Sequence, residues 1–168
     1  TGLPYGSNTW NIHTFFGSAF TSYAGYATNA TSTEFNIGTF GMGATSNPST
    51  LSGYIGCNPG NDNWGVQAMR QGFPCGVYNI IGRGHDDNVQ VFVDYDGNGT
   101  FDFTSTNFTC CNQAGFVNQT LWSGTLTSAS RVQINLAEGS GDAYVDIDFT
   151  LATPAVNAGA VGGITNGT

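Results

Sequence analysis

The sequence predicts an all-β fold, an antiparallel β-sandwich with little helix and with disulfide bonds. Short runs of alternating apolar and polar residues recur along the chain, and clusters of Gly, Asn, Asp or Pro separate them. No apolar stripe with the 3.6-residue period of a helix persists for more than about two turns. Because a short strand cannot bury its apolar face alone, many such strands in one domain must pack as a sandwich or a barrel.

The expected strands follow from apolar alternation or β-branched residues within each run. In chain order they cover residues 9–16, 53–55, 76–81, 89–94, 100–103, 119–125, 131–136 and 144–151. The hairpin formed by residues 91–94 and 100–103 is the strongest local prediction, because Asp-Gly-Asn-Gly at residues 96–99 supplies the positive φ angles of a tight turn.

We expect one domain over residues 1–152. After Ala152 the alternation gives way to Ala, Gly, Val and Asn, so residues 153–168 are expected to be a linker or the start of another module. The sequence has neither an initiator Met nor the apolar core of a signal peptide. We therefore expect a piece of a larger, mature product whose secretion signal lies outside this sequence.

The charge balance excludes several partners. The 168 residues include 11 acidic residues, three arginines and no lysine, which gives a net charge of −8. This charge repels nucleic acid and anionic membrane surfaces, and no run of about 18 apolar residues is present to insert into a bilayer. Only 8% of the residues are charged, so Ser, Thr, Asn and Gly must solvate the surface. A surface of this composition indicates a secreted or cell-surface protein.

Four cysteines, Cys57, Cys75, Cys110 and Cys111, occur without a Cys-x-x-Cys pair or a nearby His pattern. This spacing argues against a zinc ribbon and favours disulfide bonds formed in an oxidising compartment. Three connectivities are possible. A vicinal Cys110–Cys111 bond would be strained, so we expect each of these residues to pair with Cys57 or Cys75. The alternative is that Cys110 and Cys111 are buried thiols.

The pair Asp86-Asp87 is the most informative feature of the chain. It lies between the Gly-rich segment 82–85 and an apolar-alternating strand. Two adjacent carboxylates at the start of a strand can hold a hard cation, which prefers oxygen ligands. The alternative is a solvated acidic turn that binds nothing. His85 is expected to be a polar neighbour of the pair rather than a metal ligand.

A second cation site is predicted at residues 94–102. Asp94, Asp96, Asn98 and Asp102 have the spacing of the oxygen ligands at positions 1, 3, 5 and 9 of EF-hand calcium loops. The twelfth position is Ser105 rather than a bidentate Glu. The same residues therefore also suit an ordinary hairpin turn without calcium. If an ion binds here, its expected role is to stiffen the hairpin.

The sequence gives no sign of catalysis. It contains no Gly-x-Ser-x-Gly elbow, no His-Glu-x-x-His motif and no phosphate-binding loop. A glycosidase needs two facing carboxylates, for which Asp86 and Glu138 are available, but nothing around them in sequence keeps one of them protonated. We therefore predict that the chain is not an enzyme.

A series of short motifs follows one another in order along residues 5–152. They are Gly53-Tyr54, Cys57, GNDNW at 60–64, RQGFPCG at 70–76, HDD at 85–87, Cys110-Cys111 and EGSG at 138–141. Together the series resembles the PA14-type β-sandwich domains of large secreted or cell-surface adhesins of Bacteroidetes. Residues 153–168 are similar to the opening of the Ig-like repeats that follow one another in such adhesins. The resemblance therefore implies a multidomain, secreted parent protein, with neighbouring domains of the same chain as partners.

The resemblance also implies a calcium site. In lectin-like PA14 domains an Asp-Asp pair joined by a cis peptide bond holds calcium, a loop before the last strand completes the coordination, and sugar hydroxyls take the open positions. In this sequence the pair is Asp86-Asp87 and the loop is 138–142, in which Glu138 and Asp142 are the candidate ligands. Calcium accepts such a set, because it takes six to eight oxygen ligands.

The ligand itself is expected to contact loop 60–64. Asp62 and Asn63 are the polar candidates there, and Trp64 is the candidate platform for a sugar ring. Trp10 and Trp122 lie in strand-like runs and are expected in the core.

Two functions remain from different classes. The first is a calcium-dependent carbohydrate-binding module of an adhesin, with glycans or other surface ligands as partners. The second is a structural spacer of a surface protein, in which calcium only adds rigidity. An open coordination position beside Asp86-Asp87 favours the first, and a closed shell favours the second.

Overall fold

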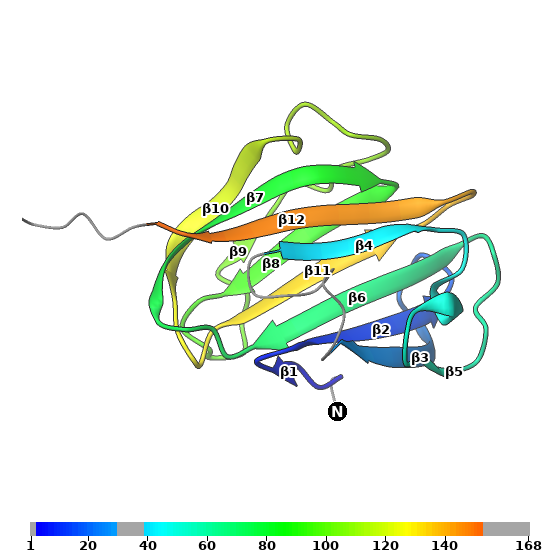
Figure 1. Ribbon diagram of the computed structural model, residues 1–168, viewed down its shortest axis with the longest axis horizontal. Coiled ribbons are helices and arrows are strands. Elements are labelled where there is room, and N and C mark those ends of the chain that lie inside the picture. The colour runs from blue at the N-terminus through cyan, green and yellow to red at the C-terminus, as the bar shows by residue number, and fades with distance from the viewer. Residues whose placement is uncertain (1–2, 30–38, 153–168) are drawn as a thin grey trace, which may run out of the picture.

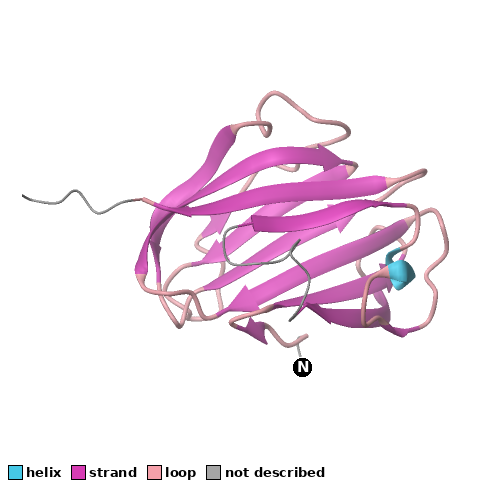
Figure 2. Ribbon diagram, in the orientation of Figure 1, coloured by secondary structure: helices cyan, strands magenta, loops and turns pink. Residues whose placement is uncertain are grey.

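The computed structural model of the chain describes residues 3–29 and 39–152 (Figure 1). Two sheets lie face to face, so the predicted all-β antiparallel sandwich is confirmed (Figure 2). One 3-10 helix, Pro48–Thr50, is the only helical segment within these residues. No helix in the described part of the chain is long and apolar enough to cross a membrane. The expected linker at residues 153–168 lies outside the described residues.

The larger sheet has eight strands in the order β5-β3-β2-β6-β11-β8-β9, with β1 joined to β6. The pairing of β1 with β6 is parallel, and the other pairings in this sheet are antiparallel. Its strands are β1 (Gly6–Ser7), β2 (Trp10–Phe16), β3 (Ser22–Asn29), β5 (Ile55–Gly56), β6 (Trp64–Gln71), β8 (Asn88–Asp94), β9 (Phe103–Thr104) and β11 (Arg131–Ala137).

The smaller sheet has four antiparallel strands in the order β10-β7-β12-β4. Its strands are β4 (Thr39–Thr45), β7 (Gly76–Asp86), β10 (Gln119–Leu126) and β12 (Ala143–Leu151). Strand β7 is long enough to run the length of the sandwich, as Figure 1 shows.

The core fills the space between the two sheets. Along β8, the inward residues Val89, Val91 and Val93 are each 0% exposed, while the residues between them are partly exposed. This period of two is the pattern that predicted the strand. Each such side chain contributes roughly 1.5–3 kcal/mol through burial. From the smaller sheet, β12 adds the similarly buried Val145 and Ile147 to the same core.

Sequence patterns do not predict β1, β3, β4 or β6. Strand β6 is central in its sheet but reads Trp-Gly-Val-Gln-Ala-Met-Arg-Gln, which contains one β-branched residue. Its inward face includes Arg70, which is 2% exposed and stacks over the ring of Phe73 at 4.9 Å. The strand conformation of β6 therefore depends on tertiary packing and not on the intrinsic strand propensity of its residues.

The expected disulfide pattern is wrong. The structure joins Cys110 to Cys111 and leaves Cys57 and Cys75 as free, exposed thiols. Cys75 directly precedes β7, whereas Cys110-Cys111 lies against Asp86 at the far end of that strand. The 11 residues of β7 separate the two ends by about 35 Å. Disulfide-bonded Cα atoms lie within about 7 Å of each other, so the strand itself prevents that pairing.

The strand register brings two crossovers to one end of the sandwich. At Asp86-Asp87 the chain passes from β7 in the smaller sheet to β8 in the larger one. At residues 138–142 it passes back from β11 to β12. Asn88 pairs with Ala137, and Asp86 pairs with Tyr144, so the two crossovers must lie side by side.

Candidate metal centre and ligand site

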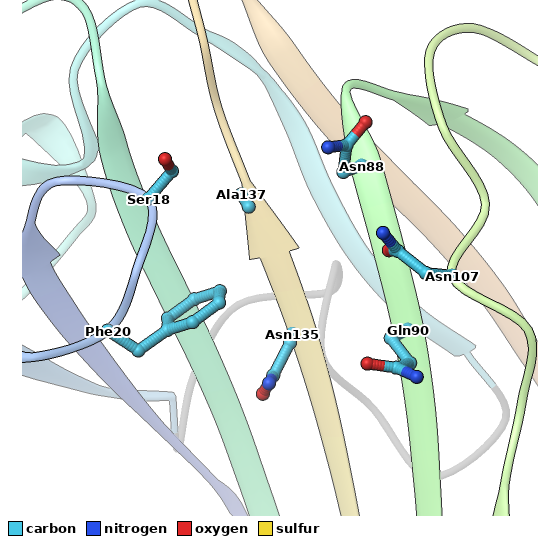
Figure 3. Close-up of a pocket in the computed structure, with 7 residues that line it drawn as sticks. All are labelled: Ser18, Phe20, Asn88, Gln90, Asn107, Asn135 and Ala137. Carbon is cyan, nitrogen blue, oxygen red and sulfur yellow. The ribbon is translucent and has the colours of Figure 1, made fainter.

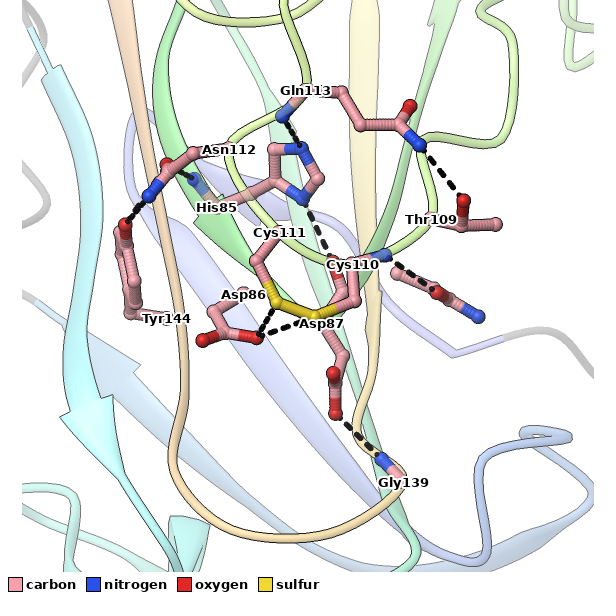
Figure 4. The surroundings of a disulfide bond; sticks show 11 residues. His85, Asp86, Asp87, Thr109, Cys110, Cys111, Asn112, Gln113, Gly139 and Tyr144 are labelled. Atoms are coloured by element: carbon pink, nitrogen blue, oxygen red, sulfur yellow. Dashed lines mark hydrogen bonds between the residues drawn. A yellow bond between two sulfur atoms is a disulfide. The ribbon is translucent and has the colours of Figure 1, made fainter.

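The two aspartates of the first crossover lie at the centre of the candidate site. Their peptide bond is cis, and both side chains are partly exposed. Asp87 Oδ2 accepts a hydrogen bond of 2.8 Å from the N–H of Gly139 in the neighbouring crossover. This contact joins the aspartate pair to loop 138–142 (Figure 4).

His85 supports the pair from inside the protein. It is 0% exposed, and its Nδ1 lies 2.8 Å from the carbonyl oxygen of Asp87. Its Nε2 accepts a 3.1 Å hydrogen bond from the N–H of Gln113, so the proton is on Nδ1, which donates to Asp87. Both ring nitrogens are therefore occupied, and His85 positions the pair without being a metal ligand.

The disulfide between Cys110 and Cys111 forms the wall of the site next to Asp86. The Oδ1 atom of Asp86 lies 3.2 Å from one sulfur and 2.8 Å from the other. The loop that carries the disulfide is tied to the end of β7, because Asn112 exchanges hydrogen bonds with His85 through its N–H (2.8 Å) and its Oδ1 (3.0 Å). The motif Cys110-Cys111 marks this loop in the sequence, but it does not predict that the loop lies beside Asp86.

Glu138 is the least satisfied polar side chain near the site. It is 0% exposed, and neither carboxylate oxygen has a hydrogen-bond partner among the described residues. Burial raises its pKa, while the nearby N–H groups of Asn63 and Trp64 oppose the rise. Asp87 raises the pKa further because a second negative charge is close.

Negative charge accumulates at this end of the molecule. Burial, followed by repulsion from Asp87, raises the pKa of Asp86. Asp62 is also close, since its Oδ1 accepts a 3.1 Å hydrogen bond from the N–H of Gly141. No arginine of the described chain forms an ion pair with these carboxylates. The charges therefore lack a counter-ion within the protein, which is the condition under which a cation binds.

An open pocket of about 190 Å³ adjoins the two crossovers. Its lining includes Ser18, Asn88, Asp87 and residues 137–140, so Glu138 and Ser140 both face it. The carboxylate oxygens of Asp86 and Asp87 and the two sulfurs lie within 4.8 Å of one another. Glu138 and Asp142 do not join that group.

The donor set suits a hard cation. The sulfurs are joined to each other and are not thiolates, so carboxylate, hydroxyl and carbonyl oxygens are the ligands on offer. Asp86 and Asp87 would hold the ion, and the buried negative charge of Glu138 would strengthen its binding from a short distance. Of the expected ligands, Asp86 and Asp87 lie together, Glu138 lies outside that group, and Asp142 is exposed.

The second predicted cation loop is organised chiefly by backbone hydrogen bonds. Asp94 is 1% exposed, and its carboxylate accepts from the N–H groups of Gly97 (2.8 Å), Asn98 (3.1 Å) and Gly99 (2.9 Å). The Tyr95 N–H donates to Asp102 at 3.0 Å. This is the pattern of the hairpin-turn alternative.

The carboxylates of that loop nevertheless remain close enough to share an ion. Asp94, Asp96 and Asp102 offer oxygens within 4.8 Å of one another. Ser105, the twelfth position, is buried, accepts from the Val91 N–H and donates to the Thr106 carbonyl. It therefore takes no part in the group, and calcium at this hairpin stays a prediction.

The structure corrects the role expected of Trp64. Its ring is 0% exposed in the core, and its Nε1–H donates to the carbonyl of Ser46 at 3.0 Å. Trp64 is the first residue of β6, and the alternation of side chains along the strand directs it into the core. Its ring therefore offers no platform to a ligand. Its loop neighbours differ: Asp62 and Asn63 are exposed, and Asn63 Oδ1 accepts from both the N–H and the Oγ–H of Ser18 at 3.2 Å.

Sequence reasoning missed two polar residues that line the pocket, Ser18 and Asn88. Asn88 directly follows the aspartate pair, so its position in the sequence was a usable signal. Ser18 comes from the connection between β2 and β3 and reaches the site through Asn63, a long-range contact that no local pattern reveals.

No protein-family model matches the chain, and no curated protein matches it in sequence. Among solved structures, the chain is similar to the PA14 sugar-binding domain from an RTX adhesin, with 14% identity and a TM-score of 0.58 over 87% of this chain and 91% of that one. It is similar to the PA14 domain of the MpAFP antifreeze protein, with 13% identity and a TM-score of 0.50 over 92% and 88% of the two chains.

A weaker likeness joins the chain to the A domain of epithelial adhesin 9 from Candida glabrata, solved in complex with Galb1-3GlcNAc. There the identity is 10% and the TM-score 0.44, over 89% of this chain and 83% of that one. The first two similarities show that the chain has the fold of PA14 domains, an all-β sandwich, as the resemblance implied.

Proposed function

We propose that the chain is a non-catalytic, calcium-dependent carbohydrate-binding module of a secreted or cell-surface adhesin. Asp86 and Asp87 hold the ion, and hydroxyl groups of a glycan complete its coordination. The observation that carries the proposal is the meeting of this aspartate pair with the buried, unpartnered carboxylate of Glu138 beside an open pocket.

The chemistry follows from what calcium requires. The ion takes six to eight oxygens at about 2.3–2.6 Å. The two carboxylates supply part of this shell. Residues 138–140 line the same pocket as Asp87, so their carbonyls and the Ser140 hydroxyl are the candidates to supply more. Because the pocket is open to solvent, positions remain for two neighbouring hydroxyls of a sugar, which distinguishes this site from a closed structural one.

The fold comparison supports the same function by analogy. The RTX adhesin structure that shares the fold is described as a sugar-binding PA14 domain. Because 14% identity carries fold and not function, the proposal depends on the residues of the site and uses the analogy only as support.

A spacer role is the second candidate, and the carboxylate group at Asp94, Asp96 and Asp102 favours it. An ion held there would stiffen the hairpin at the opposite end of β8 from the aspartate pair. The two candidates therefore predict calcium binding at different residues.

Calorimetry on the metal-stripped protein tests the proposal. Calcium is titrated first, and then methyl glycosides of neutral hexoses and of fucose are titrated in the presence of calcium. The wild type is compared with Asp86→Asn/Asp87→Asn and with the matched control Asp96→Asn/Asp102→Asn. We expect the first variant to lose the calcium heat of this site and all sugar binding, while the control keeps both.

The opposite pattern would contradict the proposal. Calcium heat that survives Asp86→Asn/Asp87→Asn and disappears in the control variant would place the ion at the hairpin and leave the spacer role. Sugar binding that persists after metal removal would exclude a calcium-dependent mechanism.

A further inference from the structure

A second pocket lies next to the aspartate site, on the outer surface of the larger sheet. It has a volume of about 270 Å³ and shares Ser18, Asn88 and Ala137 with the pocket at Asp87 (Figure 3). The two hollows therefore meet along a common wall. No function described above uses this second pocket.

Strand register assembles the pocket from outward-facing residues. Asn135 of β11 pairs with Gln90 of β8, and Ala137 pairs with Asn88. Alternate residues of these strands point into the core, so these four must point outward together. The small side chain of Ala137 leaves the space, and four amide side chains, Asn88, Gln90, Asn107 and Asn135, surround it.

In three of these amide side chains, one of the two polar atoms forms a hydrogen bond within the protein and the other does not. Asn88 Oδ1 accepts from the Cys110 N–H (3.3 Å), and Gln90 Nε2 donates to the Ser105 carbonyl (3.1 Å). Asn135 Oδ1 accepts from Gln133 Nε2 at 2.9 Å. Their other amide atoms make no hydrogen bond to the described residues, which leaves oriented donors and one oriented acceptor for a ligand.

Asn107 adds a fourth amide with both ends free. It is exposed in the loop after β9, and its side chain makes no hydrogen bond to any residue that the structure describes. In Figure 3 its amide lies over the same hollow as Gln90. Groups that both donate and accept suit hydroxyl groups, which also do both.

One aromatic ring completes the pocket on its other side. Phe20 lies in the β2–β3 connection and is only partly buried, and its ring is directed towards β11 (Figure 3). The ring lies against the backbone of β6 at Gly65, where a Cβ atom would come within 2.7 Å of two ring carbons. An edge-to-face contact with Phe15, with centroids 5.7 Å apart, holds it in place. A fixed aromatic face is what the C–H surface of a sugar ring packs against.

We propose that this amide pocket is a second sugar subsite, which takes the next residue of a neutral oligosaccharide whose first residue is bound at Asp86 and Asp87. The inference rests on the proposed function and extends it from a monosaccharide to an oligosaccharide of at least two residues. The pocket lining contains no charged side chain, so its ligand is a neutral sugar rather than an acidic one.

Calorimetry with matched sugars of increasing length tests the subsite. The probes are methyl glycosides of glucose, galactose, mannose and fucose, and neutral disaccharides that end in each of them, all with calcium present. The variants are Asn107→Ala, Asn107→Ala/Asn135→Ala and the control Gln119→Ala, which removes an exposed amide from β10 of the other sheet. Asn107→Ala removes no hydrogen bond of the described fold, so it separates ligand binding from folding.

We expect at least one disaccharide to bind the wild type about tenfold more tightly than its methyl glycoside, which is the size that one or two added hydrogen bonds give. The double variant should lose this gain, while its affinities for the methyl glycoside and for calcium stay unchanged. Asn107→Ala should lose part of the gain, and Gln119→Ala should lose none.

The outcomes separate this inference from the proposed function. If methyl glycosides bind with calcium and no disaccharide binds more tightly, or if the double variant keeps the full gain, the subsite is excluded and the proposed function stands. If no sugar binds the calcium-loaded wild type, the proposed function fails and the subsite fails with it.

Discussion

Glu138 is the residue whose effect on stability would reveal a cation bound at the proposed site. A buried carboxylate without an ion pair destabilises a fold, because nearby backbone N–H groups only partly replace the water that the charge has lost. Glu138 is 0% exposed, and its pKa is raised by burial, so its charged form is disfavoured in the folded protein. A positive ion at Asp86 and Asp87 would remove this penalty.

Glu138→Gln should therefore have opposite effects with and without calcium. In EDTA we expect the variant to be more stable than the wild type, with a free energy of unfolding about 1 kcal/mol higher, because the uncompensated charge is gone. With calcium at about 100 times its dissociation constant, the wild type should gain about 2.7 kcal/mol. The variant should bind calcium more weakly and gain less. Urea unfolding with and without calcium measures both effects.

The matched control is Asp142→Asn, which removes an exposed carboxylate from the same loop. It should change neither the stability in EDTA nor the calcium gain by much, since a solvated charge interacts weakly. Equal calcium gains for the wild type and Glu138→Gln would show that Glu138 is not near the ion.

The residue scale also shows which features of the candidate site the sequence reveals and which it does not. Adjacent acidic residues before a strand are visible in the sequence, so Asp86 and Asp87 could be named in advance. The environment of Trp64 could not, because it depends on the direction in which the first residue of β6 points. A strand that the sequence pattern does not reveal leaves the direction of its side chains unknown.

The hairpin between β8 and β9 can be interpreted either as a calcium site or as an ordinary turn, and the two interpretations predict different roles for Asp94. Asp94 is 1% exposed, accepts three backbone N–H groups and has the Arg131 guanidinium 3.7 Å away. None of these contacts requires a metal ion. The carboxylate therefore has a structural role whether or not calcium also binds.

Asp94→Ala should lower the free energy of unfolding by about 3 kcal/mol in EDTA, because it leaves several N–H groups and a half-buried guanidinium unpaired. Asp96→Ala, at an exposed position of the same turn, should cost less than about 1 kcal/mol. Urea unfolding at several EDTA and calcium concentrations distinguishes the two interpretations. A loss of stability that occurs only when calcium is present would make ion binding, and not turn closure, the main role of Asp94.

Elements differ in how strongly their sequences specify them. Strands β8, β11 and β12 have one face in the core and one towards solvent, so apolar alternation predicts them. Strand β6 lies between two others and is buried on most positions of both faces, so alternation disappears. The length of β7 was underestimated because its last residues include Gly82 and Gly84, which have low strand propensity but pair with β12.

The cysteines also show that local sequence does not predict which elements come together. Their number and spacing favour disulfide bonds over a zinc ribbon, but the pairing depends on which strand ends meet. Once β7 is known to extend from residue 76 to residue 86, Cys75 and Cys110 belong to opposite ends of the sandwich. Loop positions of this kind follow from the assembled sheets, which the local sequence does not describe.

At the scale of the whole molecule, the charge distribution predicts which glycans are rejected. The net charge is −8, and the chain has only three arginines. Arg83 pairs with Asp148, Arg131 lies beside Asp94, and Arg70 is buried at 2% exposure. No arginine is therefore available to receive the carboxylate or sulfate of an acidic sugar at the aspartate end of the sandwich.

We therefore expect a sialylated or sulfated form of any bound glycan to bind at least several-fold more weakly than its neutral form at low ionic strength. The negative field of the domain extends over about 30 Å at 0.01 M salt but only about 6 Å at 0.3 M salt, so the difference should shrink as salt is added. Calorimetry with paired neutral and acidic glycans at these two salt concentrations, with calcium held saturating, measures the effect. Equal affinities at low salt would mean that the bound calcium cancels the field where the glycan sits, and tighter binding of the acidic form would mean that the ion itself receives the acidic group.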